Sequence, residues 1–301
     1  MKILTTSNSK NFASALQKVL NIDILAVEIK KFANGEKKIR IKEKFIGEKI
    51  ILISSLSYNP DEMILETLLL ADAANRGGAL EINLVIPYLG YSLQDQVFLS
   101  GEALSSKVVA NVFSHSEIFK KIFLFDLHNF SVVGFFSLPT YHLNSLNFFY
   151  RYVADNFSSS FDNNVISSPD FGGLKKARRL AEKLAWNLVY VDKKRNLETG
   201  QVTINSFFGQ VKNKNVFILD DIIISGQTAI SLCESMKNAG ALNVYFLATH
   251  GLFVKNSINV LNQSPIDQII ITNTIDNQDL PDKFKILDLS NYFVQHFSQL
   301  F

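Results

Sequence analysis

The chain has 301 residues, of which 47% are hydrophobic, and its formal net charge is +2. This length and composition predict one large or two medium domains with a sizeable core in each part of the chain. The small net charge excludes the strong basic field that binding to nucleic acid or an acidic membrane requires.

The start of the chain lacks the long apolar run of a secretory signal, and no apolar run reaches membrane-spanning length. The single cysteine, Cys233, cannot form an intramolecular disulfide and falls on the apolar face of a predicted helix, so we expect it to be buried. These features together predict a cytoplasmic protein with no membrane segment.

Strand-like and helical patterns alternate in the first half of the chain. Short apolar runs predict strands over 49–53, 81–86 and 122–125. Between the first two runs, apolar residues at helical spacing predict a helix over 61–74. The alternation favours parallel sheets built from βαβ units.

The second half continues the same rhythm after a polar stretch at 154–164, which is a plausible boundary between halves. Strands are predicted at 164–166, 188–191, 216–219 and 244–248. Helices are predicted at 175–184 and from just after residue 228 to Gly240. We therefore expect two similar α/β domains, 1–146 and 147–301, each a mainly parallel sheet flanked by helices, with the active site between them.

The most informative segment is 216–228, where a buried strand leads into Asp220 and Asp221 and then into Ser225-Gly226-Gln227-Thr228. Hydroxyls and backbone N–H groups at a helix N-terminus can hold a phosphate, and paired carboxylates can accept hydrogen bonds from a sugar diol or gather Mg²⁺. The pattern predicts a phosphosugar site. The alternative is that the acids cap a turn and the small polar residues cap a helix.

Polar residues also follow other predicted strands. His128 follows one strand, Asp170 another, and the basic triplet Lys193-Lys194-Arg195 a third. Each alone has an ordinary explanation: a hydrogen-bonding histidine, a turn or helix cap, and a solvated loop. Because the carboxyl ends of parallel strands converge on one crevice, the set favours a shared site.

In this order along nearly the whole chain, these motifs resemble the ribose-phosphate pyrophosphokinase family, also called phosphoribosyl pyrophosphate (PRPP) synthetases. The segments that carry the resemblance are 32–36, 85–91, 94–95, 104–107, 126–128, 134–136, 168–173, 192–195, 220–228 and 249–253. The resemblance implies two phosphoribosyltransferase-like domains, an ATP-side domain over 1–146 and a domain over 147–301 that carries the ribose-phosphate loop. It also implies transfer of diphosphate from Mg-ATP to O1 of ribose 5-phosphate, giving PRPP and AMP for nucleotide biosynthesis.

The resemblance assigns a role to each motif. Asp220, Asp221, Ser225, Gly226, Gln227 and Thr228 would bind ribose 5-phosphate. Phe32, Asn34, Gly35, Glu36, Gln94 and Asp95 would bind ATP, with the Phe32–Glu36 hairpin reaching a neighbouring subunit of a homo-oligomer. His128 and Asp170 would line the Mg²⁺ site. Lys193 and Arg195 would be catalytic, on a loop over 192–202 that is expected to be poorly ordered without ligands; cations there would stabilise negative charge on the reacting phosphates.

Several positions depart from the family pattern. Leu93 stands where an arginine usually precedes Gln94, and Ile224 where a third loop acid is frequent. Gly101-Glu102 replaces a Ser-Arg pair of the common, phosphate-activated class, which resembles the less regulated, archaeal-like members. Two alternatives to an active synthetase therefore stay open: a non-catalytic regulatory homologue and a PRPP-using phosphoribosyltransferase.

Overall fold

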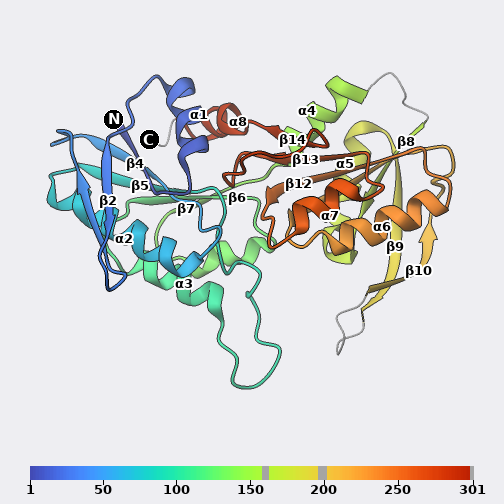
Figure 1. Ribbon diagram of the computed structural model, residues 1–301, viewed down its shortest axis with the longest axis horizontal. Coiled ribbons are helices and arrows are strands. Elements are labelled where there is room, and N and C mark those ends of the chain that lie inside the picture. The colour runs from blue at the N-terminus through green and yellow to red at the C-terminus, as the bar shows by residue number, and fades with distance from the viewer. Residues whose placement is uncertain (158–162, 196–201, 299–301) are drawn as a thin grey trace. The chain divides into compact units, whose positions relative to one another are not determined.

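The computed structural model describes residues 1–157, 163–195 and 202–298, and it divides into two compact units (Figure 1). The first unit comprises Met1–Asn144, Asn273–Asp276 and the chain from Asp288 onward. The second comprises Ser145–Thr272 and Asn277–Leu287. The sequence-based division at residue 146 assigned all later residues to the second domain, whereas the last helix packs in the first unit.

The first unit is built on a parallel sheet in the order β1-β4-β5-β6-β7. Its strands are β1 (Lys2–Thr5), β4 (Lys49–Ile53), β5 (Glu81–Ile86), β6 (Lys121–Phe125) and β7 (Thr140–Leu143). The helices are α1 (Lys10–Leu20), α2 (Pro60–Arg76), α3 (Ser105–Ser114), the short η1 (Phe130–Phe135) and α8 (Ser290–Phe297). The central strands are continuous apolar runs because a parallel sheet covered by helices buries both of its faces.

An antiparallel hairpin forms a separate two-stranded sheet in the same unit. Its strands are β2 (Val27–Lys31) and β3 (Lys37–Ile41), which pair in register from Val27 opposite Ile41 to Lys31 opposite Lys37. Figure 1 shows this ribbon beside α2, and β3 contacts that helix. The hairpin is thus attached to the unit by one of its faces.

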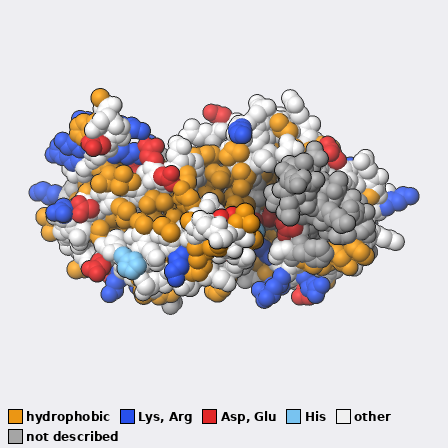
Figure 2. Space-filling model, turned by 90° about the horizontal axis from the view of Figure 1, so that it is seen from below, with side chains coloured by type: hydrophobic (Ala, Val, Ile, Leu, Met, Phe, Trp, Pro, Cys, Tyr) orange, Lys and Arg blue, Asp and Glu red, His pale blue; other side chains and the backbone are white. Residues whose placement is uncertain are grey.

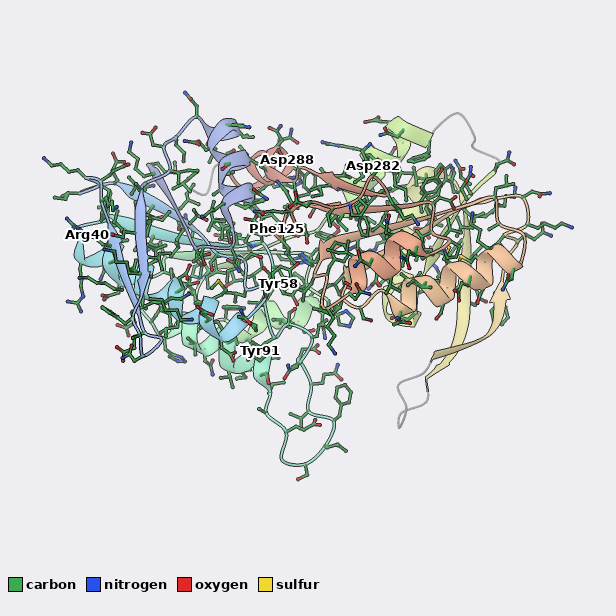
Figure 3. The ribbon with its side chains drawn as sticks, viewed as in Figure 1. Arg40, Tyr58, Tyr91, Phe125, Asp282 and Asp288 are labelled. Carbon is green, nitrogen blue, oxygen red and sulfur yellow. The ribbon has the colours of Figure 1, made fainter. Side chains whose placement is uncertain are left out.

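Helix α8 joins the first unit through aromatic packing. It lies beside α1 (Figure 1), and Phe293 is fully buried between Phe12 of α1 and Phe125 of β6, at ring-centroid distances of 6.1 and 5.2 Å. Phe125, labelled in Figure 3, is itself 1% exposed. The C-terminal helix therefore completes the core of the N-terminal unit.

The second unit contains a larger sheet in the order β10-β9-β8-β11-β12-β13-β14, parallel except for the β9–β10 pair. The strands are β8 (Asn164–Ser168), β9 (Asn187–Arg195), β10 (Val202–Phe208), β11 (Asn215–Ile223), β12 (Asn243–Gly251), β13 (Gln268–Thr272) and β14 (Phe284–Leu287). The helices are α4 (Leu146–Phe157), α5 (Phe171–Leu184), α6 (Gln227–Asn238) and α7 (Ser257–Gln263).

The structure confirms the predicted fold class: two α/β units, each with a mainly parallel sheet flanked by helices. Cys233 is fully buried on α6, as predicted, and burial raises the pKa of its thiol to about 12. Within the described residues, no helix combines the length and apolar character needed to cross a membrane.

Candidate active site

The hairpin tip presents the first group of predicted site residues. Phe32 and Glu36 face each other across the tip, where the Phe32 N–H donates to the Glu36 carbonyl at 2.8 Å. The Gly35 N–H donates back to the Phe32 carbonyl at 2.9 Å, and Gly35 has a φ of +92°, as a glycine closing a short hairpin loop requires. The Asn34 Oδ1 accepts the Glu36 N–H at 3.2 Å, so the turn is preformed.

Phe32 is 53% exposed on this tip, which excludes burial of its ring in the core of its own unit. Asn34, Gly35 and Glu36 are exposed beside it. An exposed aromatic ring flanked by an amide and a carboxylate can stack on a planar base and accept hydrogen bonds from it. The tip is therefore suited to contact a nucleotide.

Two loops of the first unit meet where neighbouring parallel strands end. Gln94 and Asp95 follow β5, and His128 follows β6, which pairs with β5. The Asn129 amide donates to the Asp95 Oδ2 at 2.6 Å and so ties the two loops together. Gln94 is held as well, since its Oε1 accepts the Ser105 hydroxyl at 2.7 Å. His128 is exposed at this edge of the sheet.

Asn129 and Ser105 were not among the predicted site residues. Each orients a predicted residue from a distant part of the chain, 34 and 11 positions away in sequence. Two features of the sequence could have drawn attention to them: Asn129 directly follows His128, and Ser105 lies in the segment 104–107 that carries the family resemblance.

The second unit carries the acid pair and its loop. The strand β11 extends to Ile223, so Asp220 and Asp221 lie inside the strand. The sequence had indicated that they follow its end. The additional length comes from pairing with β12, where Asp220 lies opposite Ala248 and Ile223 opposite Gly251. The acids still sit near the carboxyl end of the strand, ahead of the loop that leads into α6.

The loop between β11 and α6 brings Ser225 and Thr228 to the N-terminus of α6. Gly226 occupies the N-cap position with a φ of +79°, and a Cβ there would come within 2.7 Å of the Leu261 side chain, so only glycine fits. The Ser225 hydroxyl accepts the Gln227 N–H at 3.4 Å, and Ser225, Gln227 and Thr228 are exposed. Exposed hydroxyls and helix N–H groups are suited to a phosphate.

Asp220 is buried near two other carboxylates of the second unit, Asp221 and Asp170. The pKa of the Asp220 carboxyl is raised well above its ordinary value of 3.8, first by burial, next by the negative charge of Asp221, and to a smaller extent by Asp170. Asp170 follows β8, which pairs with β11, so the acids share one edge of the sheet. Such an arrangement favours a bound cation or hydrogen-bond donors that relieve the repulsion.

Asp170 has a local role too. It is the N-cap residue of α5, and its Oδ1 accepts the Gly173 N–H at 2.9 Å. His128, its predicted partner at the Mg²⁺ site, belongs to the first unit. Among the described residues, no three His, Cys, Asp or Glu side chains form a ready-made metal site. The oxygen donors present suit Mg²⁺ held partly by waters and substrate phosphates, which is how proteins commonly bind this ion.

The predicted catalytic residues Lys193 and Arg195 lie at the carboxyl-terminal end of β9. Lys193 pairs with Ile204 and Arg195 with Val202 across the antiparallel ladder with β10. For these two residues the structure describes the backbone alone. The remainder of the predicted loop, 196–201, lies outside the described residues.

The chain thus has two α/β units, one of which carries an acid pair beside a loop suited to a phosphate. This is the architecture of the PRPP synthetase fold, which consists of two phosphoribosyltransferase-like domains. A solved phosphoribosylpyrophosphate synthetase from Mycobacterium smegmatis has the same fold, with a TM-score of 0.90 over 99% of this chain and 98% of that chain, at 24% identity. Residues 1–116 match the N-terminal domain of ribose phosphate pyrophosphokinase, and residues 201–300 match the phosphoribosyl synthetase-associated domain.

Relatives extend this similarity over nearly the full length. A ribose-phosphate pyrophosphokinase of Thermotoga maritima is 33% identical over 97% of this chain and 92% of the relative. One from Helicobacter hepaticus is 31% identical over 98% of this chain and 94% of the relative. The chain belongs to the ribose-phosphate pyrophosphokinase family.

Proposed function

We propose that this protein transfers diphosphate from Mg-ATP to O1 of ribose 5-phosphate. The O1 hydroxyl attacks the β-phosphorus of ATP, the bond from that phosphorus to the α,β-bridging oxygen breaks, and AMP leaves while PRPP forms. The observation that carries the proposal is the acid pair Asp220-Asp221 joined to the loop at the N-terminus of α6, in a chain similar to pyrophosphokinases along nearly its entire length.

The second unit would bind the acceptor. Ser225–Thr228 and the first N–H groups of α6 hold the 5-phosphate, and Asp220 and Asp221 accept hydrogen bonds from the ribose hydroxyls. The pKa of Asp220 is raised by burial and then by repulsion from Asp221, and a diol that donates to Asp220 stabilises its charged form against both. Acceptor binding and acid-pair electrostatics are therefore coupled.

The first unit would bind the donor nucleotide. Phe32 stacks on adenine, Asn34, Gly35 and Glu36 contact the base and its ribose, and Gln94 and Asp95 lie at the loop tied to Asn129. Mg²⁺, when bound, would supply positive charge that neutralises the phosphates of ATP. Asp170 offers it oxygen ligands, while His128 binds a phosphate or a metal-bound water, because Mg²⁺ rarely takes nitrogen. Lys193 and Arg195 supply positive charge to the reacting phosphates.

The exposed Phe32 also supports a homo-oligomer in which the hairpin tip completes a neighbour's ATP site. Mixing a Phe32→Ala/Glu36→Ala chain with a Lys193→Ala chain tests this. After verified subunit exchange, some sites combine an intact hairpin tip from one chain with an intact Lys193 from the other, and these sites should regain activity. No recovery would mean that each chain builds its own ATP site.

The protein further belongs, in this proposal, to the less regulated, archaeal-like subtype and works in the cytoplasm. Glu102 supports the subtype: its carboxylate is fixed in this loop by the N–H groups of Phe98 and Leu99, at 2.9 and 3.0 Å, and its negative charge would repel phosphate. Activation by inorganic phosphate should be weak at fixed Mg²⁺ and ionic strength. A steep phosphate dependence would contradict the subtype.

Binding and turnover measured side by side test the function and its alternatives. We expect ribose 5-phosphate to bind, and AMP and PRPP to form with ATP and Mg²⁺. Binding without turnover would identify a non-catalytic homologue. Consumption of PRPP with a purine base, and no synthesis from ATP, would identify a phosphoribosyltransferase.

A further inference from the structure

The β2–β3 hairpin is held to its unit differently along its length. A two-stranded ribbon is marginally stable alone, so the face against α2 must anchor it. At the base, Val27, Ile39 and Ile41 pack against the hydrophobic core of the first unit. Toward the tip the same face carries Lys31 and Lys37, and apolar packing gives way to charge.

Lys31 and Lys37 stand directly opposite each other, which by itself is unfavourable. Helix α2 supplies the compensating acids. The Glu62 Oε1 lies 2.9 Å from the Lys37 Nζ and 3.4 Å from the Lys31 Nζ, so it bridges both strands. The two lysines lower the pKa of the Glu62 carboxyl, with the hydrogen bond from Lys37 as the largest cause.

Lys37 also pairs with Glu66, one turn further along α2. The Glu66 side chain is fully buried and that of Lys37 is 10% exposed. Glu66 accepts two more hydrogen bonds, from the Ser7 N–H at 2.6 Å and the Ser7 hydroxyl at 3.2 Å. A buried carboxylate is tolerated when paired and hydrogen-bonded, and removing its cation leaves an uncompensated charge.

The outer face of the hairpin differs in kind. Lys30, Lys38 and Arg40 are exposed there, and Arg40 is labelled in Figure 3. In Figure 2 blue side chains gather at the left-hand edge, on the side where Figure 1 draws β2 and β3. Exposed lysines of this kind contribute little to rigidity. The contrast singles out Lys37 as the cation that fixes the end of the ribbon.

We propose that Lys37, clamped by Glu66 and Glu62, is a positioning residue that fixes the hairpin tip for nucleotide binding. Lys37 is the residue after Glu36, so the clamp acts at the base of the Phe32–Glu36 turn. The inference rests on the proposed function in so far as the tip binds ATP. The ion pairs of Lys37 order the hairpin tip in the free protein, so less conformational entropy is lost when a nucleotide binds.

Hydrogen exchange tests the clamp without any nucleotide. In the Lys37→Met variant, the tip amides of Phe32 and Gly35 should exchange at least about tenfold faster, while amides of the parallel sheet keep their protection. Lys38→Met is the matched control, on the same strand with an exposed side chain, and should leave exchange unchanged. If Lys37→Met fails to fold, Glu62→Gln removes only the bridging acid and should accelerate the same amides. Unchanged tip exchange in the folded variant overturns the proposal.

Nucleotide binding then separates the clamp from the proposed function. α,β-Methylene ATP is the probe, and ribose 5-phosphate is the reference ligand. Lys37→Met should raise the Kd for the probe by about tenfold, leave the Kd for ribose 5-phosphate unchanged, and raise KM for ATP far more than it lowers kcat. Lys37→Arg should restore most of the affinity.

The Phe32→Ala variant distinguishes a failure of the proposed nucleotide binding at the tip from a failure of the positioning role of Lys37. If Phe32→Ala leaves probe affinity unchanged, the hairpin does not bind ATP, and it is the proposed function of the tip that is wrong. If Phe32→Ala weakens binding while Lys37→Met does not, the tip binds ATP without needing the clamp, and the positioning role is wrong.

Discussion

The Asp170 side chain accepts a hydrogen bond from the Gly173 N–H at 2.9 Å and so caps the helix α5. The same residue is the proposed oxygen ligand for Mg²⁺. Capping needs a hydrogen-bond acceptor, whereas binding a divalent cation benefits from a negative charge. Substitutions that keep one property and remove the other can separate the two roles.

We expect Asp170→Ser to preserve the cap and to lose activity. Serine is as good an N-cap residue as aspartate, so the free energy of unfolding should change little, whereas Asp170→Ala should lower it by about 1 kcal/mol. Both variants should need more Mg²⁺ for half-maximal rate. Chemical denaturation and Mg²⁺ titration of activity measure the two effects. Normal Mg²⁺ dependence in Asp170→Ser would leave capping as the role of this residue.

Asp220→Asn should make the free protein more heat-stable at pH 8 and much less active. The folded-state pKa of Asp220 is raised by burial and by Asp221. The folded state thus holds the proton more tightly than the unfolded state does. The contribution of Asp220 to stability is consequently present below pH 3.8, the ordinary pKa, and is lost as the pH rises through the raised folded-state value.

Asparagine keeps an oxygen for the Asp221 N–H, which Asp220 accepts at 2.9 Å, and removes the charge. The gain in Tm should therefore be large at pH 8 and small near pH 4. Calorimetry of variant and wild type across this range checks it. A gain in Tm that does not depend on pH would mean that charge is not what destabilises the site.

Lys193→Ala and Arg195→Ala should each lower kcat by about 10²-fold or more, with a smaller effect on KM. Cations that act on phosphates contribute most when negative charge shifts in the transition state. Steady-state kinetics with both substrates varied gives the separation. If either variant retains near-normal kcat, its catalytic role is wrong.

Phe293→Ala should lower the free energy of unfolding by about 3–5 kcal/mol, as expected for a large aromatic residue removed from a core. Phe293 is fully buried, and its ring also lies 5.8 Å from that of Phe123. Phe130→Ala is the control, because Phe130 is 66% exposed in the same unit and should change stability by less than about 0.5 kcal/mol. Equal effects would show that α8 does not complete this core.

Local pattern was enough to predict the βαβ organisation. The expected strands at 49–53 and 81–86 coincide with β4 and β5, because continuous apolar runs are what a covered parallel sheet requires. The hairpin tip over Phe32–Glu36 was expected from the family resemblance, and Asn34-Gly35 within it is a strong turn signal by itself.

What local pattern could not supply were contacts between distant residues. An apolar helix face such as that of α8 does not say against which unit the helix packs, so its packing on Phe12 was not predicted. In the same way, β11 continues through Asp220 and Asp221 because β12 pairs with Asp220 and again with Ile222 and Ile223, although two acids normally suggest that a strand has ended. The Lys37–Glu66 pair spans 29 positions and matches no motif.

The identity of the nucleotide product tests the central claim most directly. Purified protein is incubated with Mg²⁺, ATP and ribose 5-phosphate, and phosphorus NMR follows the products, with Lys193→Ala as the control for contaminating activity. We predict AMP and PRPP in equal amounts, both dependent on ribose 5-phosphate. Formation of ADP with ribose 1,5-bisphosphate, or no AMP from protein that binds both substrates, would contradict diphosphate transfer.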